Sequence, residues 1–120
     1  MKHILSRAFS TGRKLVRFER PGDGRVGIIT LDDPKLLNAM TAPMGDQFLE
    51  VIDSICQGPE SEGLGAVVLT GEGRAFSAGG DLGFLQARGN DNPSRNSVIM
   101  RRFYERFLSI RRLPIPVIAA

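Results

Sequence analysis

The chain has 120 residues, enough for a single domain with a modest hydrophobic core. Residues 1–20 hold six Lys/Arg and one acid, Glu19, and so carry a net charge of +5. Because the whole chain carries +3, the net charge of the remaining residues is −2, which argues against nucleic-acid binding. Cys56 is the only cysteine and His3 the only histidine, which excludes an intrachain disulfide and leaves residues 13–120 without a Ser-His-Asp triad or a histidine metal site.

The first twelve residues have the composition of a mitochondrial transit peptide. They carry Lys2 and Arg7, several apolar residues and Ser/Thr, and no acidic residue precedes Glu19. The run Arg7 to Ser10 resembles a matrix-processing site, with cleavage between Phe9 and Ser10. We therefore expect residues 1–12 to be a targeting segment, residues 13–120 to form the folded domain, and the protein to reside in the mitochondrial matrix. The alternative is an N-terminal segment with no targeting role.

The next elements follow a strand–strand–helix–strand order. Residues 14–20 and 26–31 alternate or run apolar, with a Pro-Gly-Asp-Gly turn between them, which predicts an antiparallel hairpin. Residues 42–57 keep helical apolar spacing, and Thr41 is well placed as the N-cap. The run Ala66–Leu69 has the pattern of a strand buried on both faces. This alternation predicts an α/β fold.

A glycine-rich turn, residues 70–81, follows that strand and leads into a helix predicted to begin near Leu82, with Asp81 at its N-terminus. Small residues let a ligand approach the main chain, and unpaired N–H groups near a helix start can stabilise an oxygen that becomes negative during a reaction. The alternative is a tight strand-to-helix turn whose glycines serve only the backbone. We interpret Asp81 as a helix cap and not as a proton-transfer group.

A second long helix is predicted over residues 95–112, capped by Ser94, and an apolar strand over residues 117–120. The helix carries six arginines: Arg95, Arg101, Arg102, Arg106, Arg111 and Arg112. They form either a solvated face on a core-packing helix or a surface for the phosphates of a ligand. Nucleic acid is disfavoured as a partner because no aromatic stacking platform accompanies them. No apolar run approaches the roughly 18 residues of a membrane span.

Three ordered motifs resemble the enoyl-CoA hydratase/isomerase (crotonase) family. The run GRAFSAGGDLG, residues 73–83, is similar to the stretch that builds half of the family's oxyanion hole. Upstream, residues 26–34 with Leu37-Asn38-Ala39-Met40 resemble its first strand and N-A-[LM] turn. Downstream, residues 113–120 resemble the strand before its second oxyanion motif. The similarity covers roughly residues 14–120 and matches the N-terminal part of the family.

The resemblance implies a spiral of strand–strand–helix repeats, incomplete at the C-terminus, that assembles as a homotrimer or hexamer. It implies an acyl-CoA substrate that carries its own coenzyme A, with no separate cofactor and no metal. The N–H of Gly80 would be one oxyanion donor. The residues expected along the coenzyme A path are Leu37, Ala39, Ala78, Gly79, Gly80, Asp81 and Leu82.

Hydration of a 2-enoyl-CoA in fatty-acid or amino-acid breakdown is the expected reaction. Isomerisation of an enoyl-CoA and hydrolysis of a 3-hydroxyacyl-CoA stay open, because the family's acid/base carboxylates follow the matched region. A non-catalytic acyl-CoA-binding or assembly module is the alternative of another class. A dinucleotide-binding protein is disfavoured, since the stretch from Gly71 lacks the third glycine of a G-x-G-x-x-G turn.

Overall fold

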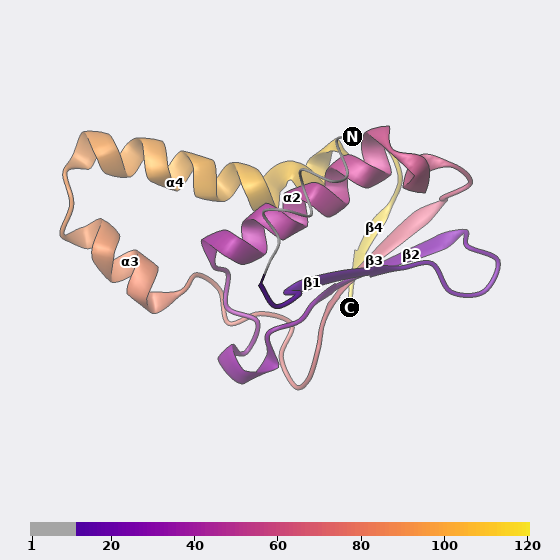
Figure 1. The fold of residues 1–120 in the computed structure, drawn as a ribbon, viewed down its shortest axis with the longest axis horizontal. Coiled ribbons are helices and arrows are strands. Elements are labelled where there is room, and N and C mark those ends of the chain that lie inside the picture. The colour runs from indigo at the N-terminus through magenta and orange to yellow at the C-terminus, as the bar shows by residue number, and fades with distance from the viewer. Residues whose placement is uncertain (1–11) are drawn as a thin grey trace.

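The computed structural model describes residues 12–120 and has the predicted α/β architecture. Four strands form one sheet in the order β1-β2-β3-β4, and helices α2 and α4 lie on one side of it (Figure 1). Residues 1–11 of the predicted targeting segment lie outside the described residues, so that interpretation stays a prediction.

The first two strands form the predicted hairpin. β1 (Val16–Glu19) pairs antiparallel with β2 (Val26–Leu31), with Val16 opposite Leu31. The turn between them contains Gly22 and Gly24 at φ of 63° and 76°, a left-handed conformation that favours glycine. The sequence pattern predicted β2 with its observed bounds, while β1 begins two residues later than the expected start at Lys14.

Helix α2 (Ala42–Gln57) covers the hairpin and supplies much of the core. Thr41 is its N-cap, as predicted, and its side chain accepts a hydrogen bond from the N–H of Met44. The helical apolar spacing places four side chains in the core beside Val16, Ile29 and Val67: Met44, Phe48, Ile52 and Ile55. Half-buried Cys56 lies at the end of this helix, with its Sγ 3.8 Å from the carbonyl oxygen of Arg112.

The central strand is less enclosed than the sequence predicted. β3 (Ala66–Gly71) pairs in parallel with β2 on one edge and with β4 (Val117–Ala119) on the other. Val67 alone in β3 is fully buried, and its other residues are half-buried. The expectation of a strand buried on both faces was wrong for this chain, because the described helices cover one face of the sheet only (Figure 1).

Two helices follow the glycine-rich turn and extend to one side of the sheet (Figure 1). α3 (Leu82–Gly89) and α4 (Pro93–Leu108) pack through the stacked rings of Phe84 and Phe103, whose centroids lie 4.7 Å apart. The cap of α4 was predicted wrongly: Asn92, and not Ser94, accepts the N–H groups of Ser94 and Arg95. Because Pro93 occupies the first helical position, the cap falls on the residue before it.

Short 3-10 helices complete the chain. η1 (Pro34–Leu36) follows β2, η2 (Pro59–Ser61) lies in the loop before β3, and η3 (Ser109–Arg112) continues from the end of α4. The predicted second long helix is therefore an α-helix followed by a 3-10 segment.

Candidate functional site

Two loops that are distant in the sequence run side by side at the carboxyl ends of β2 and β3. The N–H of Ala78 donates to the carbonyl oxygen of Leu37 at 2.8 Å, and the N–H of Met40 donates to that of Gly79 at 2.7 Å. The N–H of Asp81 donates in turn to the carbonyl oxygen of Met40 at 3.1 Å. These bonds bring together two sets of predicted site residues, Leu37 with Ala39 and Ala78 to Leu82.

Among the N–H groups of Gly79, Gly80 and Asp81, that of Gly80 alone has no hydrogen-bond acceptor within residues 12–120. Its neighbours are occupied: the N–H of Gly79 donates to Ser77 Oγ at 3.1 Å, and the N–H of Asp81 donates to Met40. Within residues 12–120 no acceptor pairs with the N–H of Gly80, and the residue is half-buried. The predicted oxyanion donor is thus an open N–H group between two paired ones.

The two glycines differ in what they allow. Gly79 has φ of 90° and nothing within 4 Å of an added Cβ, so its backbone conformation, and not space, favours glycine. Gly80 has no such φ, and a Cβ there would lie 3.3 Å from Leu85 Cδ1, the end of a flexible side chain. A small side chain at Gly80 is therefore compatible with the same turn.

Asp81 has the cap geometry that we expected. Its Oδ2 accepts the N–H of Phe84 at 2.9 Å, and its backbone precedes the first turn of α3. Helix α3 begins at Leu82, so Gly80 lies one residue before the cap and not in the first helical turn. The open N–H of Gly80 consequently comes from the loop pairing, and the helix dipole adds only a weak field there.

Asn38 connects the two loops of the site, a role that was not predicted from the sequence. Its side chain is fully buried, and its backbone is left-handed at φ of 54°. Its Oδ1 accepts the N–H of Asp33 at 2.7 Å, while its Nδ2 donates to the carbonyl oxygens of Glu72 and Ala75 at 2.9 and 2.8 Å. The amide oxygen and both amide hydrogens are therefore engaged, and their bonds connect the glycine-rich turn to the end of β2. The tolerance of asparagine for positive φ was the sequence signal that could have found it.

Ser77 continues this network toward Gly80. Its hydroxyl donates to the carbonyl oxygen of Asn38 at 2.8 Å and accepts the N–H of Gly79 at 3.1 Å. Both bonds join groups that are buried or half-buried. One hydroxyl therefore links the buried asparagine to the glycine pair.

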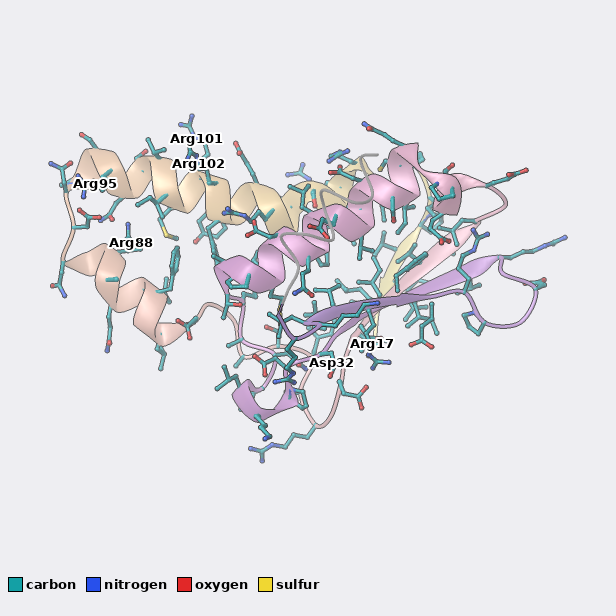
Figure 2. The ribbon with its side chains drawn as sticks, viewed as in Figure 1. Arg17, Asp32, Arg88, Arg95, Arg101 and Arg102 are labelled. Carbon is teal, nitrogen blue, oxygen red and sulfur yellow. The ribbon has the colours of Figure 1, made fainter. Side chains whose placement is uncertain are left out.

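The carboxylates nearest to the turn are already engaged. The Glu72 carboxylate is paired with the guanidinium of Arg17, which also lies 3.1 Å from Asp32, and Figure 2 shows Arg17 and Asp32 beside one another under the sheet. Asp81 caps α3. Among residues 12–120, no three His, Cys, Asp or Glu side chains are grouped so that they could hold a metal ion. None of the helices in this part of the chain has both the length and the apolar character of a membrane span.

The arginines of α4 and η3 divide into paired and unpaired groups. Arg106 pairs with Asp46, Arg112 with Asp53 at 2.8 Å, and Arg95 with Asp91 at 3.8 Å. Within the described part of the chain, Arg101, Arg102 and Arg111 form no ion pair, and Figure 2 shows Arg95 and Arg101 projecting from α4 away from the sheet. The paired arginines favour the interpretation of a solvated face on a packing helix.

Comparison with known proteins places this site in a family context. Residues 22–120 match the family model for enoyl-CoA hydratase/isomerase. A Thermus thermophilus protein assigned as an enoyl-CoA hydratase is 36% identical over 100 residues, which cover 81% of this chain and 37% of that protein. The mitochondrial enoyl-CoA hydratase of Pongo abelii is 30% identical over 117 residues, covering 95% of this chain and 38% of the relative.

Solved structures agree. An enoyl-CoA hydratase from Mycobacterium smegmatis superimposes with a TM-score of 0.73 at 32% identity, covering 89% of this chain and 39% of that one. A second, from Polaromonas sp. JS666, gives a TM-score of 0.70 at 32% identity, covering 88% of this chain and 39% of that one. The chain therefore spans well under half the length of the proteins it matches.

Proposed function

The chain belongs to the enoyl-CoA hydratase/isomerase family and has its crotonase-like α/β fold, and we propose that it supplies the first half of an acyl-CoA site. In this proposal the N–H of Gly80 donates to the thioester oxygen of the substrate and stabilises it as the oxygen becomes enolate-like. The reaction is the hydration of a 2-enoyl-CoA, in fatty-acid or amino-acid breakdown. The acyl-CoA brings its own coenzyme A, so no separate cofactor takes part.

The observation that carries the proposal is the open N–H of Gly80. The neighbouring N–H groups of Gly79 and Asp81 are held within the loop pairing, so one donor is left where a carbonyl oxygen can approach. A fixed donor of this kind does not have to reorganise when negative charge develops on the oxygen, and one donor is worth about 10²- to 10³-fold in rate. Leu37, Ala39 and Ala78, which the loop pairing brings close to Gly80, would contact the coenzyme A portion.

Proton transfer is the part of the reaction that these residues do not supply. Glu72 is neutralised by Arg17, and Asp81 is used as a cap. We propose that the acid/base carboxylates and a second oxyanion donor come from the remainder of the full-length protein. This leaves three reactions of one family consistent with the site: hydration, isomerisation of the double bond, and hydrolysis of a 3-hydroxyacyl thioester.

The experiment is a substrate panel on the full-length protein that carries this chain. Hydration removes the ultraviolet absorbance of crotonyl-CoA, isomerisation creates that absorbance from a 3-enoyl-CoA, and hydrolysis of a 3-hydroxyacyl-CoA releases a thiol that Ellman's reagent detects. We expect hydration to be the fastest of the three. Saturable binding of acyl-CoA with no turnover of any substrate would favour the non-catalytic binding module instead, and no binding at all would refute both.

Location and assembly complete the proposal. The acid-free, arginine-bearing N-terminus supports import into the mitochondrial matrix, and one relative is named as mitochondrial. We further propose a homotrimer or hexamer for the full-length protein, on the family resemblance alone.

A further inference from the structure

The side chain of Ser77 forms a hydrogen bond with the first residue of the glycine pair. Its hydroxyl oxygen accepts a hydrogen bond from the N–H of Gly79 at 3.1 Å, and the hydroxyl is itself oriented because it donates to the carbonyl oxygen of Asn38 at 2.8 Å. A hydroxyl has one proton, so donation to Asn38 leaves its lone pairs for the Gly79 N–H. The direction of both bonds is thereby fixed.

We propose that Ser77 is a positioning residue that leaves Gly80 as the open donor of the glycine pair. This inference rests on the proposed function and deepens it. Two adjacent glycines can adopt many backbone conformations, so an unrestrained pair would present its two N–H groups in varied directions. The bond from Gly79 to Ser77 removes one of the two donors and fixes the peptide plane next to the other.

The anchor of this arrangement is rigid. Asn38 is fully buried and is bonded to Asp33, Glu72 and Ala75, so the carbonyl oxygen that orients Ser77 has little freedom. On the other side, the N–H of Asp81 is held by Met40 at 3.1 Å. Met40 also donates to the carbonyl oxygen of Gly79 at 2.7 Å and so holds the peptide that carries the Gly80 N–H, while Ser77 holds the preceding peptide. Such preorganisation is what makes an oxyanion donor effective.

The test compares Ser77→Ala with Ser77→Thr in the full-length protein, with crotonyl-CoA as substrate. Ser77→Ala removes the hydroxyl, and we expect kcat to fall about 3- to 10-fold with KM nearly unchanged, the size expected for one lost hydrogen bond that acts on the transition state. Ser77→Thr keeps a hydroxyl and should retain most of the activity. The control is Ser61→Ala, which removes an exposed hydroxyl bonded to the carbonyl oxygen of Gly58 at 2.8 Å, in the loop before β3.

A spectroscopic measurement separates positioning from a merely structural role. The absorption band of a bound dienoyl-CoA moves to longer wavelength when its carbonyl oxygen is polarised. We expect this shift to be smaller in Ser77→Ala than in the parent protein and to return in Ser77→Thr. An unchanged shift and unchanged kcat in Ser77→Ala, with or without a loss of thermal stability, would overturn the inference. An equal loss in Ser77→Ala and Ser77→Thr would overturn it as well.

If Ser77→Ala does not fold, amide hydrogen exchange in the parent protein tests the inference without a variant. The amide of Gly80 should exchange at least about 5-fold faster than that of Gly79, because only the latter is bonded. Equal protection of the two amides would contradict the assignment. The proposed function has its own test: if the parent protein turns over no acyl-CoA, the proposed function is wrong, and the inference about Ser77 is overturned as well.

Discussion

Met40 and Gly80 form a single parallel bridge that joins the loop after β2 to the loop after β3. Met40 uses both of its backbone polar groups, accepting from Asp81 and donating to Gly79, and so skips the N–H of Gly80. The register of this bridge determines which N–H is left open. A shift by one residue that placed Met40 opposite Gly79 would close the donor at Gly80 and release that of Asp81.

Replacing Gly80 by proline should abolish the donor. We expect Gly80→Pro to lower kcat for crotonyl-CoA by about 10²- to 10³-fold in the full-length protein, since proline has no N–H. Gly80→Ala is the matched control: it retains the N–H, and its Cβ meets only the flexible end of Leu85 at 3.3 Å. Thermal melting of both variants should accompany the kinetics. Near-normal turnover by a folded Gly80→Pro enzyme would place the donor elsewhere.

Asn38→Asp should destabilise the protein while preserving its shape. The aspartate can still accept from the N–H of Asp33, but it would place an oxygen against the carbonyl oxygens of Glu72 and Ala75, where the amide now donates. We expect a loss of about 2–4 kcal/mol in the free energy of unfolding, measured by urea denaturation. Asn90→Asp, in the exposed loop between α3 and α4, is the control and should change the stability far less. An equal, small effect in both variants would show that the Asn38 network contributes little.

Glu50 offers a prediction about pH. The partial burial of its carboxyl group, and secondarily the negative charge of Asp46, raise the pKa of Glu50 above its usual value. Because the folded state disfavours the ionised form, the charge destabilises the protein at neutral pH, and this penalty disappears as the pH falls through the raised pKa toward 4.5. Glu50→Gln should therefore increase the stability at pH 7 slightly, by less than about 0.5 kcal/mol since the side chain is exposed and screened.

The increase should vanish near pH 4, where the parent glutamate is protonated. Denaturation curves of Glu50→Gln and of Glu62→Gln, which changes an exposed loop carboxylate, at both pH values would measure this. A gain for Glu50→Gln that is the same at pH 4 and pH 7 would rule out the ionisation of Glu50 as its origin.

Residues 1–20 should direct a fluorescent reporter to the mitochondrial matrix. The segment carries six Lys/Arg with one acid at Glu19, and such a charge is drawn by the membrane potential. A fusion in which Lys2, Arg7, Arg13 and Lys14 are changed to glutamine is the control and should remain cytosolic. Equal distribution of the two fusions would end the targeting hypothesis, as would an intact Met1 on protein recovered from mitochondria.

The 120-residue chain expressed alone should neither turn over crotonyl-CoA nor remain monodisperse. Its nearest carboxylates are engaged by Arg17 and by the cap of α3, so general acid/base catalysis, typically worth 10²- to 10⁴-fold, is missing. Among residues 12–120, β4 pairs with β3 alone and Ile118 is 55% exposed, so the sheet formed by these residues ends in an open apolar edge. Light scattering and a hydration assay on the purified chain would test both parts. A soluble monomer that hydrates the substrate would refute them.

Local patterns predicted most of the elements because each depends on nearby residues. The spacing of apolar residues predicted the bounds of α2, and Thr41 was identified as its cap from its residue type and position. The cap of α4 was misplaced because Ser94 was weighed without its neighbour Pro93, whose position marks Asn92 as the cap.

The candidate site could be predicted only in part. A glycine-rich turn indicates an approachable backbone, but which N–H stays open depends on partners contributed by the distant loop around Met40. The roles of Asn38 and Ser77 depend likewise on hydrogen bonds to groups 34 to 39 residues away, which periodicity does not reveal.

The bond between Ser77 and Asn38 has a consequence for synthesis on the ribosome. The two residues are 39 positions apart, and translation proceeds at about 5–20 residues per second, so the carbonyl of Asn38 is made roughly 2–8 s before the hydroxyl that it will orient. During that interval the Nδ2 of the asparagine lacks its partners Glu72 and Ala75, and the hairpin of β1 and β2 can already form because its contacts are local. Maturation of the site is therefore timed by the emergence of β3 and the turn that follows it. A slow stretch of codons between these two residues would lengthen the period in which the half-built core is open to chaperones.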